Sequence, residues 1–282
     1  MMSVTVFVVV LFAAFLHALW NSMVKGDGDK QLAIAAVVFG HVPIALVLIP
    51  FVDLPAPASW PYIVSGGLLH VGYQLFLARA YRAGDLSQVY PIARGSAPLI
   101  VTIVSVSFLS VALTSLQLLA IVIIAVGIMS ICMVRGEDAK INYHGAGLAL
   151  ITGMFIAAYS LVDGLGARLA GTAVGYYSWL TVINSLVFLV VVLVDRPRIF
   201  QDIAARAKTV FIVGGIASFA AYALVIWAFT QAPIALVTAL RETSIVFALL
   251  ISTYHLKERF GWGKLTAMIL TLCGVVLLRI NH

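Results

Sequence analysis

Residues 86–134 read LSQVYPIARGSAPLIVTIVSVSFLSVALTSLQLLAIVIIAVGIMSICMV, and Arg94 is the only charged residue among these 49. A run of this length is enough for two helices that each cross a hydrocarbon core of about 30 Å. Comparable apolar runs recur along the 282-residue chain, which is 63% hydrophobic and 10% charged. Because so much apolar surface exceeds what a soluble core of this size can bury, the composition predicts an integral membrane protein.

Polar and turn-forming residues divide the chain into ten apolar segments. Backbone polar groups in lipid need hydrogen-bond partners inside the protein, and a helix supplies them within one segment. The alternation that is typical of transmembrane strands is absent from the sequence. We therefore predict an all-α protein with ten transmembrane helices. Their predicted bounds are 4–24, 31–52, 61–82, 87–108, 115–135, 144–165, 172–194, 209–229, 234–254 and 261–280.

The two halves of the chain share the spacing of several residues. Arg94 and Arg241 are 147 positions apart (241 minus 94), as are Gly127 and Gly274. Five helices per half is an odd number, so the second half must enter the membrane upside down. Inverted repeats of this kind are typical of secondary transporters, with the substrate site near the midplane between the halves. The predicted five-helix repeats are residues 1–137 and 138–282.

Arg94 and Arg241 are the two arginines that lie deep inside apolar runs. A charged side chain at that depth is costly, so it usually faces a cavity or a partner and marks a functional site. Pro91 and Pro98 flank Arg94 and cannot donate backbone hydrogen bonds, which predicts a local break in the helix. The alternative is that Arg94 snorkels toward the headgroups.

Glu242 follows Arg241 directly in the sequence. Adjacent residues on a helix point about 100° apart, so these two side chains cannot pair easily with each other. Glu242 can instead neutralise an arginine elsewhere, such as Arg94, as a structural ion pair. It can equally be a protonatable coupling group while the arginines hold an anion. Both alternatives stay open at the level of sequence.

Polar and aromatic side chains form stripes on several segments and suit the wall of a wet cavity. Each of them is equally compatible with packing between helices. With Arg94, Arg241 and Glu242, the predicted substrate-binding residues are His17, Trp20, Asn21, Tyr73, Gln74, Tyr159 and Tyr222.

Several classes of function are disfavoured by what the sequence lacks. It contains no nucleophile elbow, no phosphate-binding P-loop and no cysteine–histidine metal spacing. We therefore expect no enzyme activity, no cofactor and no metal. The net charge of +6 comes from lysines and arginines in short loops, where it sets membrane orientation instead of binding nucleic acid, and it predicts both termini outside the cytoplasm. The expected partners are a small-molecule substrate, the lipid bilayer and a coupling ion such as a proton, and a homodimer is left open.

Two short motifs resemble those of the drug/metabolite transporter superfamily, and within it the EamA-like ten-helix transporters. They are Ala18–Asn21 (ALWN) and Leu256–Phe260 (LKERF), the second followed by Gly274 in an apolar helix. The resemblance implies two inverted five-helix repeats, with helices one, three, four, six, eight and nine lining a cavity. The hairpin at residues 109–115 lacks the family's usual glutamate, and the first segment lacks the proton-coupling acidic residue of four-helix relatives. Their proton-exchange mechanism therefore does not carry over.

Together these features predict a secondary active transporter in a bacterial inner membrane that works by alternating access. Because guanidinium groups favour carboxylates and phosphoryl groups, we expect a small anionic or zwitterionic metabolite, such as an amino acid or organic acid, moved outward. One alternative is an exporter of cationic or amphipathic drugs with Glu242 or Asp163 as counter-ion. A lipid-linked flippase is another. A membrane scaffold or lipid-headgroup enzyme is disfavoured by the missing catalytic motifs.

Overall fold

The computed structural model describes residues 2–26, 28–84, 86–133, 142–255 and 262–280, and within these ranges the secondary structure is helical, without a strand. The helices up to residue 133 are α1 (Val4–Gly26), α2 (Lys30–Leu48), α3 (Trp60–Ala83), α4 (Leu86–Ser107) and α5 (Ser115–Ser130). The later helices are α6 (Tyr143–Ala170), α7 (Ala173–Asp195), α8 (Ile199–Arg206), α9 (Gly215–Gln231), α10 (Ile234–Arg241), α11 (Ser244–His255) and α12 (Trp262–Ile280). Short 3₁₀ helices are η1 (Ile49–Phe51), η2 (Pro57–Ser59) and η3 (Ile131–Met133), and η4 (Val210–Gly214) is one turn of π-helix.

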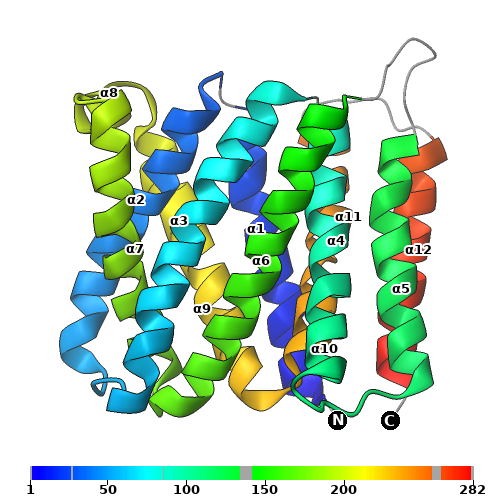
Figure 1. Ribbon diagram of the computed structural model, residues 1–282. Coiled ribbons are helices and arrows are strands. Elements are labelled where there is room, and N and C mark those ends of the chain that lie inside the picture. Colours follow the sequence, from blue (N-terminus) through cyan, green and yellow to red (C-terminus); the bar gives the residue numbers. More distant parts are fainter. Residues whose placement is uncertain (1, 27, 85, 134–141, 256–261, 281–282) are drawn as a thin grey trace.

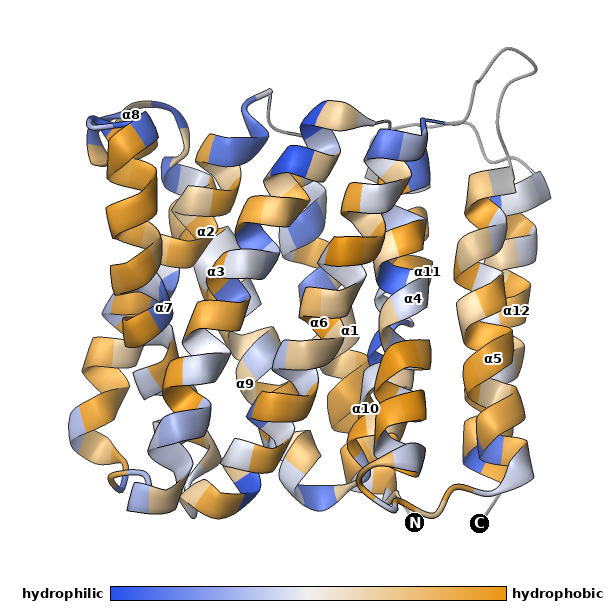
Figure 2. Cartoon of the chain, viewed as in Figure 1, coloured by the Kyte–Doolittle hydropathy of each residue, from blue (hydrophilic) through white to orange (hydrophobic). Residues whose placement is uncertain are grey.

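Most of the long helices have the length and composition of membrane spans. Eight spans in the described part of the chain are apolar enough to cross a membrane, with α10 and α11 together forming one of them. Helix α5 is apolar but shorter, and α3 is long but carries His70, Gln74 and Arg79. Figure 2 shows apolar residues along the middle of the bundle and hydrophilic residues gathered at its upper end. The protein is therefore an all-α, multi-pass membrane protein.

The helix bounds agree with the predicted segments to within a few residues, with three differences. Helix α8 lies between residues 195 and 208, where no helix is expected from the sequence. The segment predicted at 234–254 is divided after Arg241 into α10 and α11. The break predicted around Pro91 and Pro98 is wrong, because α4 runs unbroken through both prolines. Each proline removes one hydrogen-bond donor, and membrane helices tolerate that loss where neighbouring helices cover the freed carbonyl.

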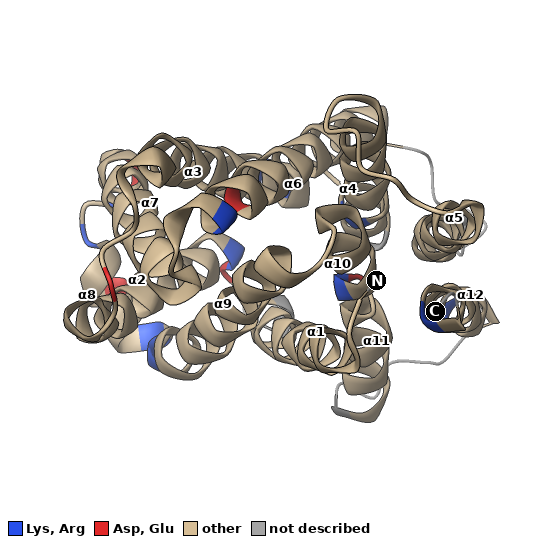
Figure 3. Cartoon of the chain, turned by 90° about the horizontal axis from the view of Figure 1, so that it is seen from below, with Lys and Arg blue, Asp and Glu red and all other residues tan. Residues whose placement is uncertain are grey.

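The helices pack in pairs that involve both early and late parts of the chain. Helix α6 lies against α3 and α4, and α1 lies against α9, α10 and α11, while α2 packs on α7. In Figure 1 all long helices run along one common direction, and α1 begins at the end of the bundle where α12 finishes. Seen end-on in Figure 3, α5 and α12 form a pair at one edge. These pairings leave α1 and α6 each bordered by helices that are distant in sequence.

Two glycines bring α5 and α12 into close contact. A Cβ atom at Gly127 would lie 2.8 Å from the Cβ of Leu270 and 3.1 Å from the backbone nitrogen of Thr271. A Cβ atom at Gly274 would lie 2.6 Å from Cγ1 of Ile124 on the other helix. Each glycine therefore makes room for the opposite helix, and the two contacts mirror each other.

Candidate functional site

Arg94 of α4 forms a buried ion pair with Glu242, which follows α10. The Nε atom of Arg94 is 2.9 Å from Oε2 of Glu242, and the two side chains are 6% and 0% exposed. Nη2 of Arg94 also donates a hydrogen bond to the hydroxyl of Ser244, at 3.1 Å. A buried charge is tolerated when it is paired and hydrogen-bonded. Of the two arrangements left open for Glu242, the structure contains the ion pair with Arg94.

A tight turn in the middle of a membrane span places Glu242 in this position. Helix α10 ends at Arg241 and α11 begins at Ser244. The backbone N–H groups of Glu242 and Thr243 donate to the carbonyls of Ala239 and Leu240, both at 3.1 Å, so the turn is of the 3₁₀ type. Such tightened turns inside a helix are often functional hinges. The turn directs two consecutive charged side chains toward different neighbours.

Arg241 has a different environment from Arg94. Its side chain is 2% exposed, and its Cζ atom lies 5.8 Å from the centre of the Tyr222 ring, within the range of a cation–π contact. Its Nε and Nη2 atoms are buried and find no hydrogen-bond partner among the described residues. Leaving buried donors unpaired is costly. Arg241 therefore has two hydrogen-bond donors available to an acceptor that enters the site.

Three of the predicted tyrosines form a continuous aromatic wall beside Arg241. The ring of Tyr159 (α6) lies 5.6 Å from that of Tyr73 (α3) and 5.9 Å from that of Tyr222 (α9), measured between ring centres. Edge-on aromatic contacts of this kind contribute to packing beyond the apolar area they bury. The wall connects three helices and reaches the guanidinium group of Arg241 through Tyr222.

The predicted residues of α1 differ in what they contribute. His17 is within electrostatic range of both arginines and its ring contacts that of Trp20, with 5.1 Å between their centres. The indole nitrogen of Trp20 is buried without a hydrogen-bond partner in the described part of the chain. Asn21 instead donates its side-chain amide to the carbonyl of His17, at 2.8 Å. His17 therefore lies near the two arginines and Trp20 packs on His17, whereas the Asn21 amide is bound by its own helix.

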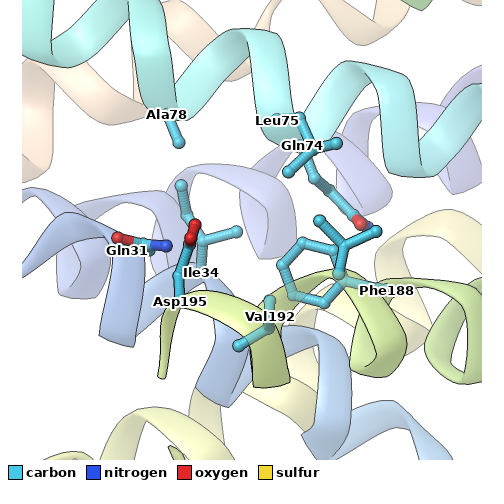
Figure 4. Close-up of a pocket in the computed structure, with 9 residues that line it drawn as sticks. Gln31, Ile34, Gln74, Leu75, Ala78, Phe188, Val192 and Asp195 are labelled. Atoms are coloured by element: carbon cyan, nitrogen blue, oxygen red, sulfur yellow. The ribbon is translucent and has the colours of Figure 1, made fainter. Parts of the chain in front are cut away.

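Gln74 does not join the arginines. It lines a small pocket between α2, α3 and α7, shown in Figure 4. The residues that line this pocket are Gln31, Ile34, Gln74, Leu75, Ala78, Phe188, Val191, Val192 and Asp195. Gln74 follows Tyr73 on α3, and neighbouring residues of a helix point about 100° apart. When Tyr73 faces Tyr159, Gln74 is therefore turned toward α2 and α7.

A second buried pair of ionisable side chains lies outside the predicted binding residues. Nε2 of His70 (α3) is 2.8 Å from Oδ2 of Asp163 (α6), whose side chain is 0% exposed. The same oxygen accepts a hydrogen bond from the Tyr222 hydroxyl at 2.7 Å, and Oδ1 accepts one from Tyr176 at 3.4 Å. A carboxylate inside an apolar segment is by itself a signal of a functional position, and the sequence contains that signal at Asp163.

Comparison with known proteins agrees with this architecture. A sequence model of the EamA-like transporter family matches residues 144–280. These residues belong to the EamA-like transporter family. The resemblance to the drug/metabolite transporter superfamily is thereby confirmed, and it indicates a membrane transporter of small molecules.

A solved crystal structure of another protein aligns with 99% of this chain and 99% of its own length, with a TM-score of 0.74 and 16% identity. At that identity the likeness shows the fold alone. No curated protein matches the sequence. The substrate therefore has to be inferred from the site.

Of the two motifs that resemble those of EamA-like transporters, one lies within the described residues and the other does not. The segment Ala18–Asn21 lies in α1 and contains Trp20, whose ring contacts that of His17. The segment at residues 256–260 lies outside the described residues. In the part of the motif region that is described, Gly274 serves the close contact between α12 and α5.

Proposed function

We propose that this protein is a secondary active transporter that moves a small anionic or zwitterionic metabolite, such as an amino acid or organic acid, outward across a bacterial inner membrane. The environment of the Arg241 side chain is the observation that supports the proposal. Its guanidinium group is buried, and two of its donor atoms have no hydrogen-bond partner in the described part of the chain. Glu242, the nearest carboxylate in sequence, pairs with Arg94. A substrate carboxylate or phosphoryl group would accept hydrogen bonds from both free nitrogens of Arg241 and neutralise its charge.

The aromatic wall supplies the rest of the proposed binding site. Tyr73, Tyr159 and Tyr222 offer ring faces and edges next to Arg241, and Trp20 of α1 offers an indole N–H without a partner among the described residues. Binding sites for small molecules combine such apolar surfaces with a few polar groups that fix orientation. In this proposal Arg241 selects the charge of the substrate, and the aromatic residues hold its body.

We further propose that the chain crosses the membrane ten times in two inverted five-helix repeats, residues 1–137 and 138–282. Helices α3 and α5 would add to the eight apolar spans. The packing of α3 on α6 has a counterpart in that of α9 on α1, and the contacts of Gly127 and Gly274 across α5 and α12 are reciprocal. Contacts of this kind are expected around a twofold axis in the membrane plane. Alternating access would then be a rocking of the repeats about the arginine site.

The orientation of the proposed transporter rests on the basic loops. Arg196 and Asp29 form an ion pair between the start of α2 and the end of α7, and Arg82 of α3 donates a hydrogen bond to Gln31 at the same end of the bundle. Lysines and arginines of short loops favour the cytoplasmic side. We therefore propose that this basic end faces the cytoplasm and that both termini lie outside it.

Transport by purified protein in liposomes tests the proposed function. Liposomes loaded with unlabelled succinate, glutamate or phenylalanine would receive a trace of the same compound in labelled form, at equal pH on both sides. We expect the wild-type protein to exchange at least one probe, and Arg241→Gln to lower its exchange rate at least about tenfold, because the anion loses its main partner. The matched control is Arg206→Gln on the exposed face of α8. Wild-type exchange by Arg241→Gln would overturn the proposal.

One observation favours a second candidate function, the export of cationic or amphipathic compounds. The Asp163 carboxylate is buried next to His70 and three tyrosines, and a carboxylate among aromatic rings suits an organic cation. Exchange of labelled tetraphenylphosphonium in the same liposomes separates the two candidates. Dependence of that exchange on Asp163, together with no dependence of any probe on Arg241, would establish the cation exporter instead.

A further inference from the structure

The His70–Asp163 pair and the Arg241 site share one side chain. The hydroxyl of Tyr222 donates to Oδ2 of Asp163 at 2.7 Å, and the ring of the same tyrosine lies 5.8 Å from Cζ of Arg241. His70 reaches the same carboxylate oxygen at 2.8 Å. A single residue of α9 therefore contacts both the carboxylate pair and Arg241.

Titratable groups surround the pair on every helix that packs against it. The His70 ring stacks on Tyr159 of α6, with 4.1 Å between ring centres, and meets Tyr222 of α9 at 5.2 Å. From α7, Tyr176 donates to Asp163 and Tyr177 lies 5.2 Å from Tyr222. His41 of α2 lies 6.4 Å from Tyr177, and Tyr73 of α3 lies 5.6 Å from Tyr159. From α4 and α10 the charged groups are the Arg94–Glu242 pair, which neutralises itself, and Arg241.

We propose that the His70–Asp163 pair takes up one proton for each anion bound at Arg241, so that anion and proton cross the membrane together. The outward concentration gradient of the anion drives export, and an acid exterior drives the same cycle in reverse. The inference rests on the proposed function, in which Arg241 holds the anion. Before uptake, the pair is an Asp163 carboxylate and a neutral imidazole whose Nε2–H faces it, with a net charge of −1. The proton comes from water and binds Nδ1 of His70, which makes the pair neutral. On the other side of the membrane the same N–H bond breaks and the proton returns to water.

The direction of this coupling follows from the charges. An empty Arg241 is an uncompensated positive charge, and it opposes protonation of a nearby imidazole. An anion bound at Arg241 cancels that charge and favours protonation. Thermodynamic linkage then requires that protonation of the pair strengthens anion binding by the same factor. Coupling between two sites typically changes affinity by roughly 5- to 150-fold.

This arrangement assigns different tasks to the buried ionisable side chains. Glu242 is held by Arg94 and stabilises the turn between α10 and α11. His70 and Asp163 carry the proton, and Arg241 carries the anion. Tyr222 positions the two sites relative to each other, because it contacts both. The anion and the proton that cross together have a net charge one unit more positive than that of the anion alone.

The experiment compares two measurements on the same liposomes. Exchange at equal pH reports the anion site alone, whereas accumulation of labelled succinate, glutamate or phenylalanine driven by an acid exterior also requires the proton. We expect wild-type protein to accumulate the probe that it exchanges and to acidify the lumen, as reported by trapped pyranine. Asp163→Asn and His70→Gln should lower accumulation at least about tenfold more than they lower exchange. Asp53→Asn, an exposed aspartate between α2 and α3, is the matched control.

The outcomes separate this inference from the proposed function. Accumulation at the wild-type level by Asp163→Asn and His70→Gln would overturn the proton site while leaving the anion site intact. An equal fall of exchange and accumulation, together with a lower melting temperature, would also overturn it, because the pair would then be structural. If Asp163→Asn does not fold, the comparison of accumulation with exchange in His70→Gln provides the test. Normal exchange by Arg241→Gln would instead overturn the proposed function itself.

Tyr222→Phe provides an independent test of the connection between the two sites. It removes only the hydroxyl that bonds Asp163 and keeps the ring beside Arg241. We expect the dependence of probe binding on pH to become at least about threefold weaker than in the wild-type protein. Tyr143→Phe, on an 80% exposed tyrosine at the start of α6, is the control. An unchanged pH dependence in Tyr222→Phe would overturn the role of Tyr222.

Discussion

Arg94 and Glu242 are joined by a separation of 2.9 Å between Nε and Oε2 in a fully buried setting, and this contact ties α4 to the turn between α10 and α11. It also decides how the two intramembrane arginines differ. Glu242 is paired with Arg94, whereas two donor atoms of its neighbour Arg241 have no hydrogen-bond partner among the described residues. Two arginines that lie 147 positions apart in the sequence therefore have different surroundings.

Removal of Glu242 is expected to destabilise the protein. In Glu242→Ala, Arg94 would remain as an uncompensated buried charge, at a cost of about 3 kcal/mol or more. The double variant Arg94→Met with Glu242→Leu removes both charges and should recover most of that loss. Thermal unfolding in detergent, followed by tryptophan fluorescence, measures both effects. A Glu242→Ala protein as stable as the wild type would show that the pair contributes nothing.

Replacement of Arg241 is expected to have the opposite effect on stability. Arg241→Met keeps a long side chain and removes a buried guanidinium with unpartnered donors, so the melting temperature should rise by a few degrees, which corresponds to about 1 kcal/mol. Transport should be lost at the same time, as is common when a site is kept for function at the expense of stability. Arg206→Met on α8 should change neither property. Destabilisation of Arg241→Met would contradict the proposal that its donors await a ligand.

The contact between α5 and α12 predicts a contrast between two glycines. A Cβ at Gly274 would lie 2.6 Å from Ile124 and 2.8 Å from the carbonyl of Ala120, so Gly274→Ala should force the helices apart and lower stability by about 1–3 kcal/mol. Gly147 on α6 has no atom within 4 Å of such a Cβ. Gly147→Ala should therefore be neutral or stabilising, because alanine favours helices over glycine by about 1 kcal/mol. The melting temperature should fall in Gly274→Ala and should stay the same or rise in Gly147→Ala.

The ion pair between Asp29 and Arg196 predicts a small, pH-dependent contribution. Burial opposes the charged form of Asp29, but the hydrogen bonds from Arg196 and from the Leu32 amide outweigh it, and the pKa of Asp29 falls below its ordinary value of 3.8. A lowered carboxyl pKa contributes stability that is fully present above 3.8 and is lost as the pH falls through the folded-state value. Asp29→Asn keeps a residue that can cap α2 and removes the charge.

At neutral pH this variant should be less stable by less than about 1 kcal/mol, because the pair is partly exposed. The difference from the wild type should disappear in acid. A series of melting temperatures between neutral pH and strong acid measures it, with Asp53→Asn as control. A difference that persists at the acidic end would show that the charge of Asp29 is not its cause.

Much of the helical framework could be predicted from local sequence. The predicted segment at 172–194 corresponds to α7 at Ala173–Asp195, and that at 61–82 to α3 at Trp60–Ala83. Apolar length and flanking polar residues are local properties, and the bilayer imposes one scale on all of them. Helix α8 was missed because it is short and lies in a polar loop, where that scale does not apply.

The candidate site was less predictable than the helices. The intramembrane charges Arg94, Arg241 and Glu242 could be identified because each is exceptional in an apolar run. Gln74 lines a pocket between α2, α3 and α7, and Asn21 bonds its own helix. A stripe of polar residues does not reveal which neighbour each one faces. His70 became important only when α3 was seen beside α6.

The sequence by itself determined that this is a helical membrane protein and which residues bear charge within the membrane, because hydrophobic length and the cost of buried charge are properties of each segment alone. Only the tertiary structure decided the partners. The turn after Arg241 points Glu242 at Arg94 and leaves Arg241 beside Tyr222, and the packing of α3, α6 and α9 gathers His70, Asp163 and Tyr222. These contacts join residues far apart in the chain, and they depend on how all the helices fit together.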